Sequence, residues 1–222
     1  MNVLDTIKRS LIMFFLGLPL IIISIIFFLG LGLGNAGLLF LSAGHMTIVP
    51  AVVLILHFIT GFLINRFINV NVPYSDIGQL VPSIPVSAFT TEINVWPSYW
   101  MAHFTFFCSY IFSNAYKVYY LPPVSDSEDY ITKIQARTSR AMVIMIFTAT
   151  IFVALAFIRL RYTNTEHVFG VLFTTVIFGA FGYAWLLASN ELGIRTMDIF
   201  GVAQQMLLVQ DPSKPTTCVN QS

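Results

Sequence analysis

Long uncharged, apolar stretches separated by short polar segments dominate the pattern along the chain. The four longest stretches without any Asp, Glu, Lys or Arg are residues 10–65, 93–116, 141–158 and 167–190. A transmembrane helix needs about 20 mainly apolar residues to cross about 30 Å of hydrocarbon at about 1.5 Å per residue. The pattern therefore predicts five membrane-spanning helices, over residues 11–33, 44–64, 98–118, 140–158 and 168–189.

The first of these stretches is long enough for two helices and contains a natural break. The break is the segment Gly30-Leu-Gly-Leu-Gly34-Asn35, because Gly weakens a helix interior and Asn supports a turn. Continuous apolar runs disfavour a closed β-barrel, whose strands read as alternating segments of about 10 residues. We therefore expect an all-α, polytopic transmembrane helical bundle, with four spans in place of five if residues 98–118 lie in the membrane interface. Residues 1–189 would form the transmembrane domain, and residues 190–222 an amphipathic helix followed by an extended tail.

Composition supports lipid as the main solvent of the chain. Of its 222 residues, 57% are hydrophobic and 9% are charged, where a soluble domain carries about 25% charged residues. Eleven Lys and Arg and ten Asp and Glu leave a net charge of +1, which excludes a disordered chain and a basic nucleic-acid-binding protein. Basic residues divide almost evenly between the two sides of a five-span topology, so the positive-inside rule leaves the orientation open.

Aromatic residues bracket the third predicted span. Trp and Tyr gather at membrane–water interfaces, because one end of the ring is apolar and the other forms hydrogen bonds. The predicted interface anchors are Trp96, Tyr99, Trp100, Tyr116, Tyr119 and Tyr120. The segment before this span, residues 70–97, is rich in Pro and in interleaved apolar residues. We interpret it as a long loop that either folds over the helix ends or docks a partner protein.

The fourth span is predicted to be the distal part of a longer helix over residues 126–160. Ser125 and Glu128 form a capping-box pattern, and no Pro or Gly follows until past the end of this segment. About 13 residues at about 1.5 Å each would then stand outside the hydrocarbon as a projecting helix. Its basic residues Lys133, Arg137 and Arg140 would contact a neighbouring protein or the phosphates of anionic lipids, unless the segment is a solvated stalk.

Small residues follow a four-residue spacing in the fifth span. Ala180, Ala184 and Ala188 would let a second helix approach closely, within this chain or in a dimer. Polar residues at or within membrane depth are His57, Asn65, His103 and Asn114. Such residues mark an ion path or form hydrogen bonds between helices. We favour hydrogen bonds, because the spans carry no acidic or basic residue at depth and no Pro breaks a helix at its midpoint.

The sequence contains no recognisable enzyme motif. Phosphate-binding loops, His-Glu-x-x-His, Gly-x-Ser-x-Gly and Cys-x-x-Cys are all missing, and Cys108 and Cys218 are poorly placed for a disulfide. We therefore expect no catalytic, cofactor-binding or metal-binding residues, no cofactor, no nucleic-acid partner and no small-molecule substrate. The expected partners are the lipid bilayer and other membrane or capsid proteins.

One resemblance bears on the function. Trp96-Pro-Ser-Tyr-Trp100, Ser113-Asn-Ala-Tyr-Lys117 and the Phe-rich spans resemble multi-pass membrane proteins of large icosahedral double-stranded DNA viruses, particularly those that infect algae. The similarity covers about residues 80–120. It implies a minor capsid protein in a virion internal membrane, linking that membrane to the capsid shell. The alternatives are an accessory subunit of a large membrane complex, such as a respiratory assembly, and a small channel or transporter.

Overall fold

The computed structural model describes residues 3–67, 98–120, 128–161 and 168–193, and these residues are almost entirely helical. The helices are α1 (Val3–Leu33), α2 (Ala36–Phe67), α3 (Tyr99–Tyr119), α4 (Glu128–Arg161) and α5 (Val168–Glu191). The prediction of an all-α fold is confirmed over these ranges, and each predicted span coincides with one helix to within a residue or lies inside it. The predicted loop over residues 70–97, the cap at Ser125 and most of the segment 190–222 lie outside the described residues.

Three of the helices are long and apolar enough to cross a membrane. They are α2 over Ala36–Leu56, α4 over Gln135–Arg161 and the whole of α5, Val168–Glu191. In α1, the segment Gly17–Leu33 is also apolar but is shorter than these three. The structure therefore supports a membrane protein by the length and composition of these helices.

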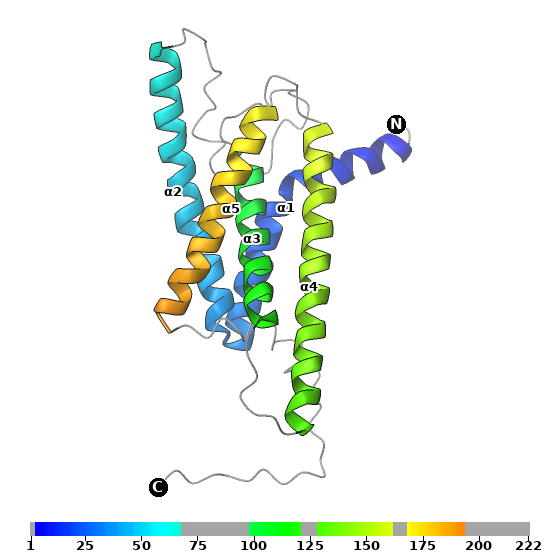
Figure 1. Cartoon of the computed structure of the whole chain (residues 1–222). Helices are drawn as coiled ribbons and strands as arrows, with labels where there is room; N and C mark the ends of the chain where they lie inside the picture. Colours follow the sequence, from blue (N-terminus) through cyan, green and yellow to red (C-terminus); the bar gives the residue numbers. More distant parts are fainter. Residues whose placement is uncertain (1–2, 68–97, 121–127, 162–167, 194–222) are drawn as a thin grey trace.

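Successive helices run in alternating directions, so that α1, α3 and α5 descend and α2 and α4 ascend in Figure 1. The central helix is α3, which makes its most extensive contacts with α5 and α4 and also contacts α2. The first turns of α4 lie beyond the C-terminal end of α3 in this view. The C-terminal end of α3, the N-terminal half of α4 and the C-terminal end of α5 therefore lie toward the same end of the bundle.

The turn between α1 and α2 forms where the sequence predicted a break. Gly34 has a φ of +61°, a conformation that glycine adopts without steric cost. The Asn35 amide donates to the Gly30 carbonyl at 2.9 Å and the Gly34 amide donates to the Leu31 carbonyl at 3.3 Å, which is the Schellman pattern of a helix end. Asn35 then caps α2, because its Oδ1 accepts from the Leu38 amide at 3.0 Å.

Two prolines lie inside helices. Pro19 is in α1 and Pro50 is near the midpoint of α2, yet each helix continues past its proline. Each proline leaves one carbonyl of the preceding turn without its helical amide donor. The expectation that no Pro breaks a helix at its midpoint is confirmed for α2, which continues as one helix past Pro50.

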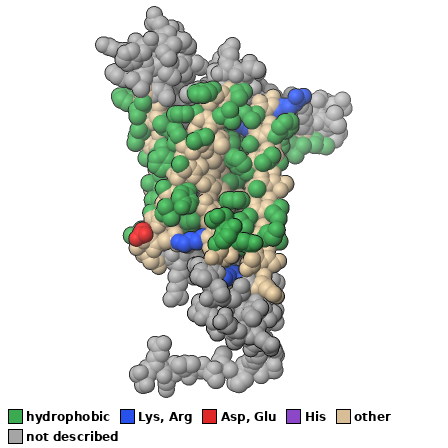
Figure 2. Space-filling model, viewed as in Figure 1, with side chains coloured by type: hydrophobic (Ala, Val, Ile, Leu, Met, Phe, Trp, Pro, Cys, Tyr) green, Lys and Arg blue, Asp and Glu red, His purple; other side chains and the backbone are tan. Residues whose placement is uncertain are grey.

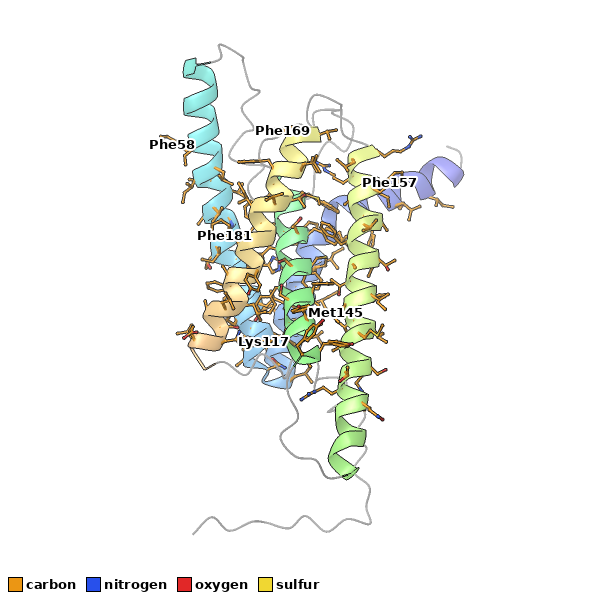
Figure 3. The ribbon with its side chains drawn as sticks, viewed as in Figure 1. Phe58, Lys117, Met145, Phe157, Phe169 and Phe181 are labelled. Carbon is orange, nitrogen blue, oxygen red and sulfur yellow. The ribbon has the colours of Figure 1, made fainter. Side chains whose placement is uncertain are left out.

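The apolar side chains divide between a buried core and an outer surface. Phe106 and Tyr110 of α3 pack with Leu41 of α2 and with Phe178 and Leu186 of α5 in the centre. Large apolar side chains also cover the outside of the helices, as Figures 2 and 3 show. Examples with about two thirds or more of their surface exposed are Phe58 72%, Phe157 66%, Phe169 68% and Val176 72%. An exposed apolar surface of this extent fits a lipid environment.

A candidate lipid-facing groove and buried polar contacts

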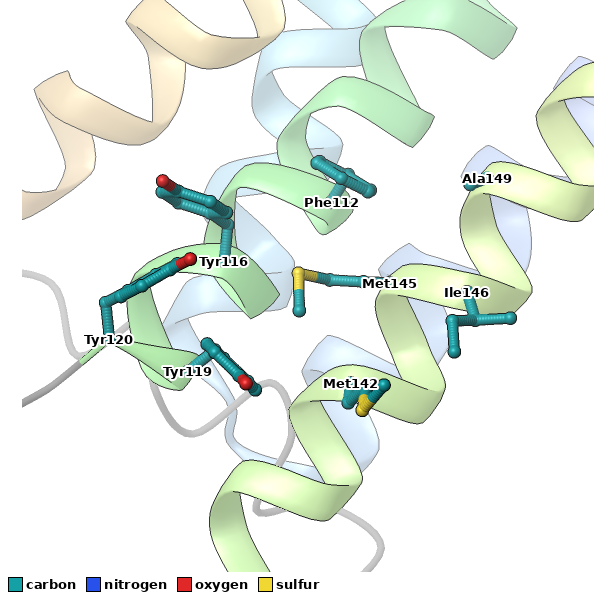
Figure 4. Close-up of a pocket in the computed structure, with 8 residues that line it drawn as sticks. All are labelled: Phe112, Tyr116, Tyr119, Tyr120, Met142, Met145, Ile146 and Ala149. Carbon is teal, nitrogen blue, oxygen red and sulfur yellow. The ribbon is translucent and has the colours of Figure 1, made fainter.

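A groove lies between α3 and α4 at the end of the bundle where α3 terminates (Figure 4). Its volume is about 430 Å³, which falls in the range of about 300–1,000 Å³ typical of small-molecule sites. All of its lining residues are uncharged: Phe112, Tyr116, Tyr119 and Tyr120 from α3, and Met142, Met145, Ile146 and Ala149 from α4. The groove is open to the surroundings of the protein along its length.

Helical periodicity places these residues along one edge of each helix. Side chains three or four residues apart lie one above another on a helix, as Phe112 and Tyr116 do on α3 and Met142 and Ile146 do on α4. Met145 extends from α4 toward Phe112 and Tyr116 and partly fills the space (Figure 4). Ala149, which carries only a methyl group, lines the end of the groove farthest along α4.

Three of the predicted interface anchors gather at one end of this groove. The rings of Tyr116 and Tyr120 lie 4.6 Å apart between centroids, and those of Tyr119 and Tyr120 lie 5.0 Å apart. Tyr116 is 52% exposed and Tyr120 is 64% exposed, which suits side chains at a membrane interface.

The anchors predicted at the other end of α3 behave differently. Trp100 is buried, with its ring 5.3 Å from that of Phe104, so its side chain contacts the bundle, and its role as an interface anchor stays a prediction. Tyr99 is half-buried and places its ring against the edge of His103 at 4.3 Å. The start of α3 therefore uses its aromatic rings for contacts inside the bundle, because α1 and α4 pack beside it there. Trp96 lies outside the described residues.

Basic side chains surround the same end of the bundle. Lys117 is exposed and lies one residue after Tyr116 and three before Tyr120, near the end of α3 (Figure 3). On α4, Arg140 is exposed and Arg137 is half-buried. Arg140 precedes Met142 by two residues, or about 200° of helical rotation, so it projects from the side of α4 away from the groove. Lys133 belongs to α4, but its side chain is outside the described set.

A buried pair of histidines joins α2 to α3. The Nδ1 atoms of His45 and His103 are 3.0 Å apart and both side chains are 1% exposed. One ring must therefore carry its proton on Nδ1 and donate it, while the other accepts at Nδ1 and carries its proton on Nε2. Neither Nε2 has a hydrogen-bond partner among the described residues. The sequence identified His103 as a polar residue at membrane depth, but nothing in the spacing indicated His45 as its partner.

A second polar contact connects three helices at the opposite end of the bundle. Arg159 of α4 is 4% exposed, and its Nη2 donates to the Ser98 hydroxyl at 3.4 Å. The same hydroxyl accepts from the Met101 amide and thereby caps the N-terminus of α3. The Ser98 amide donates to the Thr174 hydroxyl of α5 at 3.3 Å. The sequence did not predict this cluster, which requires the ends of α3, α4 and α5 to meet.

Close contact between α3 and α5 depends on Gly182. A Cβ atom placed on Gly182 would lie 2.6 Å from the Phe106 carbonyl oxygen and 3.0 Å from Ser109 Cβ. The Ser109 hydroxyl also donates to the Gly179 carbonyl at 2.6 Å. These contacts use the small-residue principle that the sequence indicated, on a different face of the helix.

The predicted alanine stripe does not form this contact. Ala180 and Ala184 are exposed and Ala188 is half-buried. The prediction that Ala180 and Ala184 pack against another helix of the same chain is therefore wrong, because Gly179 and Gly182 lie on the face of α5 that meets α3. The alternative of packing against a second copy stays a prediction.

The remaining polar residues predicted from the sequence do not belong to either of these two polar contacts. Asn114 is 1% exposed in α3, whereas the side chains of His57 and Asn65 lie outside the described set. Cys108 is buried, and within the ranges that the structure covers no three His, Cys, Asp or Glu side chains are grouped as metal ligands would be.

In comparisons with protein-family models, curated proteins and solved structures, the chain shows no match.

Proposed function

We propose that this chain is a non-enzymatic, multi-pass integral membrane protein that links a lipid bilayer to neighbouring proteins. The observation that carries the proposal is the apolar outer surface of the helices, with Phe58, Phe157, Phe169 and Val176 exposed. In water such a surface would cause association, whereas in a bilayer it contacts lipid tails.

All five helices cross the bilayer in this proposal. The three long apolar helices support it directly by length and composition. The central position of α3 adds an argument, because a helix packed between α4 and α5 lies at the same membrane depth as they do. The polar side chains of His103 and Asn114 are compatible with this location, because both are buried inside the bundle and do not face the lipid tails.

The link to other proteins is assigned to the N-terminal part of α4. This 34-residue helix is about 50 Å long at about 1.5 Å per residue, which exceeds the hydrocarbon thickness of about 30 Å. Lys133, Arg137 and Arg140 follow Glu128 and Asp129 of the first turn, so residues 133–140 form a locally basic segment suited to an acidic surface. The resemblance of residues 80–120 to minor capsid proteins makes a capsid shell around an internal membrane the first such partner to test.

Charge reversal tests this assignment. The triple variant Lys133→Glu, Arg137→Glu and Arg140→Glu should resist alkaline extraction from membranes as the wild type does, but should be lost from the native particle or complex. Arg161→Glu, an exposed reversal at the opposite end of α4, is the matched control and should be retained.

Four outcomes would count against the proposal or against one of its parts. Retention of the triple variant would show that the contact lies elsewhere, and release of the wild type by alkali would remove the membrane location. Solute or ion flux through the purified protein in liposomes, abolished by substituting Asn114, would assign the chain to a channel or transporter. Co-purification with redox subunits would favour an accessory subunit of a respiratory assembly.

A further inference from the structure

We propose that the groove between α3 and α4 binds one acyl chain of an anionic phospholipid, with the lipid phosphate held at Lys117 and the neighbouring tyrosine hydroxyls. This inference rests on the membrane location proposed above and adds a defined lipid site to it. The ligand class follows from the lining of the groove, from its polarity along the helix axis and from the charge at its end.

The lining suits a hydrocarbon chain. Phe112, Met142, Met145 and Ile146 present ring, thioether and methyl surfaces along the groove (Figure 4). Methionine is unbranched and polarizable, and so adapts to a flexible ligand. In a bilayer an open apolar groove is filled by the tails around it, because no water is present to occupy it. A lipid chain is therefore the natural occupant of this space.

The groove is polar at one end only. Tyr116, Tyr119 and Tyr120 lie in the last turn of α3, whereas Ala149 lies about two turns further into the apolar part of α4 than Met142. A phospholipid has the same arrangement, with a hydrogen-bonding headgroup at the interface and its chains directed toward the bilayer centre. Tyrosine hydroxyls donate hydrogen bonds to phosphate oxygens while their rings contact the upper part of the chain.

The charge at this end favours an anionic headgroup. Lys117 is exposed in the last turn of α3, one residue from Tyr116 and three from Tyr120 (Figure 3). Glu128 and Asp129 in the first turn of α4 and Glu191 at the end of α5 also lie toward this end, so the positive charge is local to Lys117 and is not a property of the whole end of the bundle. Lys117 does not line the groove, but it precedes Tyr120 by three residues, and residues at this spacing are neighbours on the helix surface, so its ammonium group lies beside the tyrosine end of the groove. It is therefore assigned to the lipid phosphate.

Native mass spectrometry of the full-length protein tests the site. The protein is purified in detergent and mixed with equal amounts of phosphatidylglycerol and phosphatidylcholine that carry identical chains. The wild type should retain phosphatidylglycerol in preference to phosphatidylcholine. Lys117→Gln should lower that preference about fivefold, the effect expected for one basic residue near a membrane surface. Arg161→Gln, which removes an exposed cation at the other end of the bundle, should leave the preference unchanged.

A second pair of variants tests the groove itself. Ala149→Trp places an indole in the groove and should remove the retained lipid of both classes. Ala154→Trp is the matched control, because Ala154 is also exposed on α4 but lies about 140° around the helix from Ala149. Circular dichroism checks that both variants keep the helical content of the wild type. A variant that has lost it is replaced by Ala149→Leu, for which reduced lipid retention is expected.

Each contrary result has a specific meaning. Undiminished lipid in Ala149→Trp would overturn the groove as the site, and an unchanged headgroup preference in Lys117→Gln would overturn the role of Lys117. A dimer that disappears in Ala149→Trp without loss of lipid would show that a second copy occupies the groove and would also overturn the proposal. Release of the wild type from membranes by alkali is the separate failure of the membrane location.

Discussion

The contact between α3 and α5 makes a specific prediction at Gly182. A Cβ atom at this position would lie 2.6 Å from the Phe106 carbonyl oxygen, which belongs to the backbone of α3 and cannot move without shifting that helix. At Gly179, one turn earlier on the same helix, the nearest atom to an added Cβ is the Thr105 methyl carbon at 3.7 Å, an ordinary van der Waals distance. Gly182→Ala and Gly179→Ala therefore introduce the same methyl group into two different environments.

The expected magnitudes follow from this difference. Replacing Gly by Ala inside a helix contributes about 1 kcal/mol of helix propensity, and both variants receive it. Overpacking a close contact costs about 1–3 kcal/mol, and only Gly182→Ala meets that cost. The free energy of unfolding of Gly182→Ala should therefore lie about 1–3 kcal/mol below that of Gly179→Ala.

Reversible unfolding in mixed detergent micelles measures this difference, with SDS as the denaturant and circular dichroism as the signal. Because the two variants share the same helix and the same substitution, effects of the detergent on helix propensity cancel in the comparison. Equal stabilities, or a more stable Gly182→Ala, would refute the close approach of α3 and α5 at this position.

Further substitutions test the polar contacts by the same unfolding assay. Replacing either His45 or His103 by Leu leaves the other imidazole nitrogen unpaired and should cost about 1–3 kcal/mol, whereas the double variant should cost less than the sum of the two. Additive losses would contradict a hydrogen bond between the rings. Asn35→Ala should cost about 1 kcal/mol through loss of the α2 cap. Ser98→Ala should cost more than Asn35→Ala, because it removes the α3 cap and also the acceptor of Arg159. Equal losses would show that the Arg159 contact contributes nothing.

The positions of the helices could be predicted from the sequence because they depend on the length of each apolar run. A helix that crosses hydrocarbon must satisfy its backbone within itself, so about 20 apolar residues define it locally. The break at Gly34 and Asn35 is equally local, since a positive φ and a side-chain cap are properties of those residues. Tyr116, Tyr119 and Tyr120 could likewise be predicted as a group at the end of α3, because their positions depend only on where the apolar run ends.

Contacts between helices were harder to predict, as α5 illustrates. Ala180, Ala184 and Ala188 follow a four-residue spacing, whereas Gly179 and Gly182 are only three residues apart and Gly182 has Phe178 and Leu186 at the four-residue positions. Spacing alone does not say which face of a nearly uniformly apolar helix meets its neighbour. The structure places the glycines against α3 and leaves Ala180 and Ala184 exposed.

The buried polar contacts depend on the packing of distant segments. His45 and His103 are 58 residues apart, and Arg159 and Ser98 are 61 residues apart. No local pattern connects either pair. The environment of Trp100 could not be predicted from the sequence either, because an amphipathic ring at the start of a helix suits a membrane interface and a contact between helices equally well. Its burial follows from the position of α4 and α1 beside α3, which the sequence does not specify.

The central claim, a multi-pass topology in which successive helices cross the bilayer, is tested most directly by the sidedness of helix ends. Single cysteines replace the exposed residues Ala36, Arg161 and Leu192 in a background in which Cys108 and Cys218 are changed to Ser. Sealed vesicles are then treated with a membrane-impermeant maleimide before and after permeabilisation. The account predicts that Ala36→Cys and Leu192→Cys react from one side of the membrane and Arg161→Cys from the other. Reaction of Arg161→Cys from the same side as either of the other two variants would contradict it.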